Sequence, residues 1–208
     1  MEIKQSLIQS SSYNLKCPYE MAPTYITIHN TANDAPAVNE INYMKSNGSE
    51  VSFHIAVDDK EAIQGIPFNR NAWHAGDGGK GTGNRKSIAI EICYSKSGGE
   101  KFNKAFANAV EVTAQLMKQF NIPLNNIRYH KDWSGKNCPH RLLSMGIELA
   151  DFKNMVEVKY NQLYKAAEPK PAVMYQVVTG SFKDRANAEK RMAELKAKGF
   201  DSFIQAKK

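Results

Sequence analysis

Residues 24–29 read Thr-Tyr-Ile-Thr-Ile-His, an alternation that is typical of a β-strand with two different faces. Ile26 and Ile28 fall on one face, and His29 falls on the other face at the end of the strand. A loop of sequence Asn-Thr-Ala-Asn-Asp follows. The segment therefore predicts a strand that packs on the core with its isoleucines. A single histidine at a strand end is more often structural than functional, so the interpretation of His29 depends on its neighbours.

A second segment, residues 87–93 (Ser-Ile-Ala-Ile-Glu-Ile-Cys), repeats this arrangement. Its three isoleucines share one face, while Glu91 lies on the other face with Ala89 and Cys93. A carboxylate is costly to bury unless it has a partner. The repeat of a polar side chain opposite an isoleucine face favours a functional site over a purely structural role for His29.

The remaining periodicities predict an α/β fold with further strands and three main helices. Strands are expected at 51–57, with Val51, Phe53, Ile55 and Val57 on the apolar face, and at 62–67. A helix after Asp34 should bury Val38, Ile41 and either Met44 or Tyr43, and should end at Asn47-Gly48. Apolar residues at helical spacing predict two longer helices, at 102–120 and 147–164.

Residues 128–140 (Arg-Tyr-His-Lys-Asp-Trp-Ser-Gly-Lys-Asn-Cys-Pro-His) place a histidine, a lysine and a cysteine in one short segment. His130 and Cys138 are too far apart in sequence for one helical turn, so an irregular loop must fold back to bring them together. A catalytic zinc site uses about three protein ligands and leaves one position open. His29 is the candidate for the third ligand. Cys138 can serve as a ligand because three cysteines in a reducing compartment are expected to be free thiols.

His140 is an alternative ligand, because it lies only two residues after Cys138. A fourth protein ligand would close the coordination shell and make the zinc structural. A structural zinc is therefore the main interpretation of these residues that does not involve an enzyme.

Five motifs in order resemble the zinc N-acetylmuramoyl-L-alanine amidases of the second type, which share a fold with peptidoglycan recognition proteins. The motifs are Tyr-Ile-Thr-Ile-His-Asn-Thr (25–31), Ser-Phe-His-Ile-Ala-Val-Asp-Asp (52–59), Ala-Trp-His-Ala-Gly-Asp (72–77), Ile-Ala-Ile-Glu-Ile-Cys (88–93) and the His130–Cys138 segment. The resemblance covers roughly residues 1–150 and is closest to endolysins and autolysins of Gram-positive phages and prophages. It implies a mixed central β-sheet flanked by helices, and cleavage of the amide between N-acetylmuramic acid and the L-alanine of the stem peptide.

The resemblance also implies roles for individual residues. His29, His130 and Cys138 would hold Zn²⁺, Glu91 would act as the general base, and Lys136 would stabilise the oxyanion. The alternative for Lys136 is a solvated surface charge. Relatives that bind peptidoglycan without cutting it lack the metal-binding cysteine, which this chain has, so the resemblance favours an enzyme over a binding protein.

Candidate substrate contacts lie near a glycine-rich loop at 76–84. This loop leads into a strand and lacks the spacing of a phosphate-binding loop, which excludes nucleotide binding. Trp73 and His74, just before it, are expected to line a groove, where an indole can stack on a sugar. Asn30 and Thr31 are further candidate contacts. His54 shares the polar side of the strand at 51–57 with Ser52 and Ala56; a structural histidine near the site is its favoured interpretation, and a substrate contact is the other.

The composition and charge of the chain limit the kind of partner that it can bind and the compartment in which it is made. The 208-residue chain carries a net charge of +7 and a pI near 9.2, which favours an acidic partner. Its sequence lacks zinc-finger, basic-helix and ribonucleoprotein motifs, so anionic polymers of a Gram-positive wall are favoured over nucleic acid. Apolar runs are too short for a membrane span, and the first twenty residues lack a secretory signal. Synthesis in the cytoplasm without a signal peptide is expected, with action on the cell wall after release.

The composition changes after residue 164, which is the expected end of the amidase domain. Residues 165–173 read as a linker with two prolines. Residues 174–208 predict a strand at 175–182, a helix from Asp184 to Lys198 and a strand at 200–205. This small βαβ unit resembles the first half of a sporulation-related repeat, a wall-binding βαββαβ domain whose second half is missing. Because so few residues make a very small core, two copies are expected to complete the domain as a homodimer.

Overall fold

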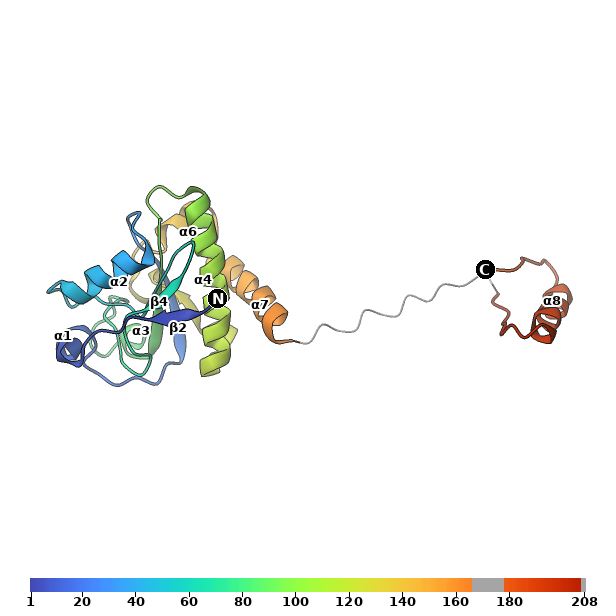
Figure 1. Ribbon diagram of the computed structural model, residues 1–208, viewed down its shortest axis with the longest axis horizontal. Helices are drawn as coiled ribbons and strands as arrows, with labels where there is room; N and C mark the ends of the chain where they lie inside the picture. Colours follow the sequence, from blue (N-terminus) through green and yellow to red (C-terminus); the bar gives the residue numbers. More distant parts are fainter. Residues whose placement is uncertain (166–177, 207–208) are drawn as a thin grey trace. The chain divides into compact units, whose positions relative to one another are not determined.

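The computed structural model describes residues 1–165 and 178–206. The chain divides between residues 166 and 167 into two compact units. The larger, amino-terminal unit contains the sheet and most of the described helices, and the described part of the smaller unit contains one helix (Figure 1).

The larger unit is built on a six-stranded sheet in the order β1-β4-β3-β5-β2-β6. Strands β3 and β4 pair antiparallel and the other neighbours pair parallel, so the sheet is mixed as expected. The strands are β1 (Ile3–Gln5), β2 (Tyr25–Asn30), β3 (Ile55–Val57), β4 (Ala62–Gln64), β5 (Ser87–Ile92) and β6 (Ile127–Tyr129).

Helices cover both faces of this sheet. Figure 1 shows α2 (Ala37–Ser46) on one side of the strands and α4 (Gly99–Phe120) with α7 (Leu149–Tyr164) on the other. The shorter helical segments are η1 (Ser10–Ser12), α1 (Tyr13–Lys16), α3 (Thr82–Lys86), η2 (Leu124–Asn126), α5 (Lys131–Ser134) and α6 (His140–Ser144). The mixed sheet between helices confirms the predicted fold class.

The two isoleucine-rich strands form the centre of the sheet. Strands β2 and β5 are parallel neighbours, and the isoleucines of both are fully buried. In their register His29 pairs with Glu91. Because both strands run in the same direction, their carboxyl ends lie at one edge of the sheet. The two polar residues singled out in the sequence are therefore brought side by side by strand pairing.

Several predicted boundaries were wrong. The strand expected at 51–57 forms only at 55–57, and Val51 is 65% exposed. Before β3 the backbone at Ser52 is not part of the sheet, because the Ser52 N–H donates to the carbonyl of Trp73. The strand expected at 62–67 is limited to 62–64.

The inner face of α2 also differs in part from the prediction. Met44, rather than Tyr43, is buried together with Ile41, whereas Val38 is 42% exposed. The reason is the helical spacing of the buried set, which starts at Ala37 and continues every three or four residues.

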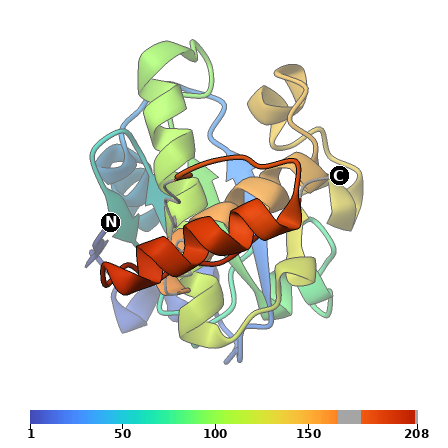
Figure 2. The same ribbon diagram turned by 90° about the vertical axis from the view of Figure 1, so that its right-hand side faces the viewer.

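The smaller unit contains a single described helix, α8 (Arg185–Ala197), preceded by Asp184 as predicted. Its half-buried residues are the expected inward set, Ala188, Met192 and Leu195. Figure 2 shows coil on either side of α8. The strand expected at 200–205 is not formed, and of the strand expected at 175–182 only 178–182 is described, also as coil. The alternation of apolar and polar residues predicted these strands, but it does not show whether a neighbouring strand is available for pairing. Most of the expected linker lies outside the described residues.

Candidate metal centre

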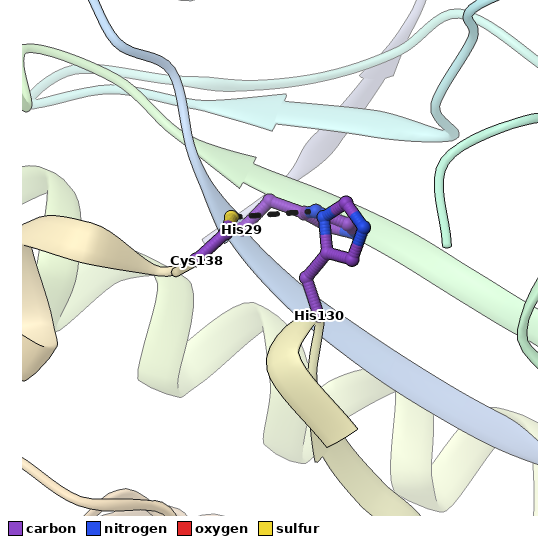
Figure 3. Close-up of side chains that lie close together, drawn as sticks. All are labelled: His29, His130 and Cys138. Atoms are coloured by element: carbon purple, nitrogen blue, oxygen red, sulfur yellow. Dashed lines mark hydrogen bonds between the residues drawn. The ribbon is translucent and has the colours of Figure 1, made fainter. Parts of the chain in front are cut away.

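Three buried donors converge at the carboxyl edge of the sheet. His29, His130 and Cys138 each offer one ligand atom, and these atoms all lie within 4.8 Å of one another. Figure 3 shows the three side chains pointing toward one another, with His29 on β2. Nδ1 of His29 lies 3.7 Å from Sγ of Cys138. The sequence-based ligand set is thus brought together by the fold.

The distance between the His29 and Cys138 donors fits a tetrahedral ion. With Zn–N near 2.05 Å and Zn–S near 2.3 Å, tetrahedral angles place the nitrogen and the sulfur about 3.5 Å apart. Nδ1 of His130 is buried and has no hydrogen-bond partner among the described residues. An unpartnered buried nitrogen is costly, and a metal ion bound there would satisfy it. The donor set is therefore able to hold a transition metal such as zinc.

Parallel strand pairing and one asparagine bring the donors together. His130 immediately follows β6, which pairs with β2, so both histidines lie at the same sheet edge. The chain then turns through the one-turn helix α5, which the sequence did not reveal, and the Lys131 N–H donates to the carbonyl of Cys138 over 2.9 Å. Asn30 Oδ1 accepts from the N–H groups of Arg141 and Leu142 and so anchors the start of α6 after the cysteine.

Burial sets the protonation of the donors. It lowers the pKa of His130 to about 4 and that of His29 well below its ordinary value, which keeps both imidazoles neutral. Burial also raises the pKa of the Cys138 thiol to about 12. A thiolate at this position therefore needs a nearby cation, and a divalent ion between the three donors provides one.

Glu91 lies beside the donors and is not one of them. Its Oε2 is buried and has no partner within the described residues. Burial, with a smaller contribution from the charge of Glu40, raises the pKa of Glu91 to about 8, and Lys136 opposes this shift. A carboxyl group whose pKa lies near neutral pH and which has no protein partner is suited to accept a proton.

Lys136 is exposed. Its positive charge lowers the pKa values of His29, His130, Glu91 and Cys138. The two sequence-based interpretations of Lys136, a solvated charge and a residue of the site, are therefore compatible.

His140 does not join the donor group. It is the first residue of α6 and is partly exposed. Within the described parts of the chain the group contains two imidazoles and one thiol, which leaves a fourth tetrahedral position available. This geometry disfavours the closed structural site that His140 would have created.

The expected substrate contact by His54 is not supported. The side chain is fully buried, its Nδ1 accepts from the Ala89 N–H over 3.0 Å, and its Nε2 lies 2.9 Å from the carbonyl of Arg70. With both nitrogens engaged, His54, which immediately precedes β3, bonds to β5 as a structural histidine, and this was the favoured of its two interpretations. Asn30 and Thr31 are also buried and hydrogen-bonded within the protein, Thr31 to the carbonyl of Ile92.

We expect His54 to make the metal-free protein sensitive to acid. Burial lowers its pKa from 6.5 to about 4, so the unfolded state binds more protons and stability is lost as the pH falls from about 6.5 toward 4. The loss from this group is about 2 kcal/mol at pH 5. His54→Gln can keep both hydrogen bonds without titrating. The free energy of unfolding, measured with urea in EDTA, should fall between pH 7.5 and pH 5 by about 2 kcal/mol less in the variant than in the wild type. An equal fall in both proteins would contradict the prediction.

Trp73 is partly exposed, as a wall residue of a groove would be. Its ring meets that of Tyr19 edge-on, with centroids 5.9 Å apart, and the guanidinium of Arg85 lies 3.9 Å above Tyr19. The sequence did not link Tyr19 and Arg85 to Trp73, because no local pattern connects segments so far apart. His74, by contrast, is buried, with its Nδ1 3.0 Å from Nε2 of His29.

A group of three donors that could hold a metal ion, beside an unpartnered carboxyl group at the edge of an α/β sheet, is the kind of site that hydrolases use. The family model for N-acetylmuramoyl-L-alanine amidase matches residues 19–141, and the SPOR domain model matches residues 152–206. The chain belongs to the N-acetylmuramoyl-L-alanine amidase family. The SPOR match begins inside α7, which packs on α4 and β6 in the larger unit.

Two curated relatives are N-acetylmuramoyl-L-alanine amidases named CwlA. The chain is 53% identical over 182 residues to the one from Bacillus sp, with 88% of this chain and 72% of the relative covered. It is 55% identical over 163 residues to the one from Bacillus subtilis (strain 168), with 78% of this chain and 60% of the relative covered. The solved structure of PlyL has 60% sequence identity and a TM-score of 0.72, covering 74% of this chain and 97% of that chain. These findings confirm the resemblance and show that the chain is an amidase.

Proposed function

We propose that this amidase cleaves the bond between the lactyl group of N-acetylmuramic acid and the L-alanine of the stem peptide, with Zn²⁺ as its metal. The observation that carries the proposal is the convergence of His29, His130 and Cys138, with Nδ1 of His29 3.7 Å from Sγ of Cys138, next to an unpartnered Glu91. The relatives named as amidases of this bond support the substrate class.

Zinc is the metal that this donor set favours. Two neutral imidazoles and one thiolate suit a borderline-soft ion, and the open position suits a catalytic site rather than a structural one. A zinc ion bound there would polarise the scissile carbonyl and lower the pKa of water to near neutrality.

Glu91 and Lys136 supply the remaining functions in this proposal. The carboxylate of Glu91 takes the proton of the attacking water and passes it to the alanine nitrogen as the C–N bond breaks. The ammonium of Lys136, whose charge already affects four groups of the centre, stabilises the negative oxygen that develops on the carbonyl. Trp73 is the substrate contact whose partial exposure supports stacking on a sugar or peptide.

The alternative is a protein that binds peptidoglycan around a structural zinc and does not cleave it. Cys138 in the donor group and the exclusion of His140 from it favour the hydrolase. Product analysis on purified Gram-positive wall separates the two. The hydrolase releases new L-alanine amino termini without new reducing ends, whereas zinc-loaded protein that releases neither would support the binding protein.

The same proposal places the enzyme at the Gram-positive wall, where it acts after release from the cell. A net charge of +7 favours binding to anionic wall polymers. Within the described residues no helix combines the length and the apolar character needed to cross a membrane. We retain the division into an amidase domain (1–164), a linker (165–173) and half of a wall-binding domain (174–208).

We further propose that residues 174–208 form a homodimer. The unit exposes an unusual share of large apolar side chains, namely Val178, Phe182, Phe200, Phe203 and Ile204. A second copy would bury them and would give the flanking coil a pairing partner. Sedimentation at tens of micromolar should show a dimer for the full chain and a monomer for residues 1–165. A monomeric full chain, or a dimer that persists after truncation, contradicts this arrangement.

A further inference from the structure

One short segment, His74–Ala75, contacts both histidines of the metal centre. Nε2 of His29 lies 3.0 Å from Nδ1 of His74, and the two rings meet edge-on at 86°. The backbone of Ala75 lies beside the ring of His130 and raises the pKa of that ring. Two adjacent residues thus reach two imidazoles that lie 101 positions apart in the sequence, at His29 and His130.

These contacts leave the correct nitrogen of each ring free for a metal. Nδ1 of His29 faces Cys138, so its Nε2 carries the proton and donates to His74. Nδ1 of His130 is the buried atom without a partner, so the side of the ring that faces the Ala75 backbone is the Nε2 side. A methyl group placed on Gly76 would lie 3.7 Å from that Nε2, so this nitrogen faces the 75–76 segment. Both rings then present Nδ1 to the centre.

The segment is itself held rigidly by Asn84. Oδ1 of Asn84 accepts from the N–H groups of both His74 (2.9 Å) and Ala75 (2.8 Å), and its Nδ2 donates to the carbonyl of Gly78 (3.1 Å). Asp77 in turn accepts from the Asn84 N–H (3.1 Å). Asn84 is only 4% exposed. A buried side chain with three bonds to one loop fixes that loop in a single conformation.

Close packing explains why the loop is rich in glycine here. A methyl group on Gly83 would lie 2.5 Å from Cβ of Ala75 and 2.9 Å from the ring of Trp133. Any larger residue at this position would push the 74–75 segment away from the imidazoles. Gly83 in this loop therefore has a structural reason to be glycine.

We propose that His74 is a positioning residue of the metal centre, and that loop 76–84, through Asn84, holds His74 and Ala75 against the two histidine ligands. This inference rests on the proposed zinc site. Partners that fix the tautomer and orientation of a ligating histidine also raise its basicity, and their loss typically weakens metal binding by about 10–100-fold. His74, expected from the sequence to contact substrate, instead lies behind His29, and the loop supports the metal rather than the wall of a groove.

Zinc affinity of the full chain tests this role without any measurement of turnover. Competition with a chromophoric chelator should give a dissociation constant about 10–100-fold weaker for Asn84→Ala and for His74→Leu. His74→Gln keeps an acceptor for the His29 N–H, and Asn84→Asp keeps an acceptor for both backbone N–H groups. His74→Gln should therefore lose less zinc affinity than His74→Leu, and Asn84→Asp less than Asn84→Ala. Lys80→Ala, an exposed change in the same loop, is the control and should bind zinc as the wild type does.

A cobalt-loaded sample adds a spectroscopic readout. Displaced imidazoles change the ligand-field absorption of Co²⁺, so the spectra of Asn84→Ala and His74→Leu should differ from the wild type, while that of Lys80→Ala should not. Far-UV circular dichroism of the metal-free variants reports whether they fold. If His74→Leu or Asn84→Ala is unfolded, the comparison uses His74→Gln and Asn84→Asp instead. These two variants must then bind zinc less tightly than Lys80→Ala does.

The outcomes separate this inference from the proposed function. If the wild type binds zinc and every variant at positions 74 and 84 binds it within twofold of the wild type, the positioning role is wrong and the zinc site stands. If the wild type binds no zinc, the proposed metal site itself is wrong.

Discussion

Cys138→Ser is expected to remove most zinc affinity and to reduce amide hydrolysis to background. The serine hydroxyl stays protonated at neutral pH and is a poor zinc ligand, so only two imidazoles remain. The remaining centre also loses the negative charge of the thiolate, which would compensate the positive charge of a metal ion in this buried site. We expect zinc binding to weaken on the order of a hundredfold or more, because a lost ligand costs at least as much as a lost partner of a ligand.

The measurement is zinc content after dialysis, together with release of L-alanine amino termini from purified wall. Cys93→Ala is the matched control, because Cys93 is an equally buried free thiol that lies outside the donor group. The control should keep both zinc and turnover. A Cys138→Ser protein that retains stoichiometric zinc would show that the ion is held by other residues, and the assignment of the centre would fail.

The central strands and the metal donors could be predicted from the sequence because their signals are local. Alternation in residues 24–29 and 87–93 identified two strands, and pairing of parallel strands then placed His29 beside Glu91. The ligands His130 and Cys138 were recognised because a histidine and a cysteine lie in one short segment, and the family resemblance supported them. Their convergence depends on Asn30 holding the start of α6, which no spacing rule predicts.

The residues that the sequence did not reveal are those whose partners are distant. His74 meets His29 across 45 positions, and its role could not be distinguished from substrate contact until burial was known. Tyr19 and Arg85 join Trp73 in the same way. The strand predicted at 200–205 was wrong for a related reason, because alternation describes the faces of a strand and not whether an edge is available for pairing.

Glu91→Gln is expected to keep zinc and to lose nearly all turnover. Glutamine matches the size of glutamate and cannot accept the proton of the attacking water, so hydrolysis should fall by roughly 10²–10⁴-fold. Zinc should remain, because Glu91 is outside the donor group. Glu157→Gln, an exposed change on α7, is the control and should leave both properties unchanged.

Thermal stability of the metal-free protein gives this prediction an independent check. Burial raises the pKa of Glu91 from 4.5 to about 8, so the unfolded state releases this proton first and the stability of the folded protein falls as the pH rises from about 4.5 to about 8. Glu91→Gln removes this titration, and its stability should therefore change less than that of the wild type between pH 5 and pH 8. A variant that loses turnover and zinc together would instead make Glu91 part of the metal site. A variant that keeps turnover would leave the proton transfer to another group.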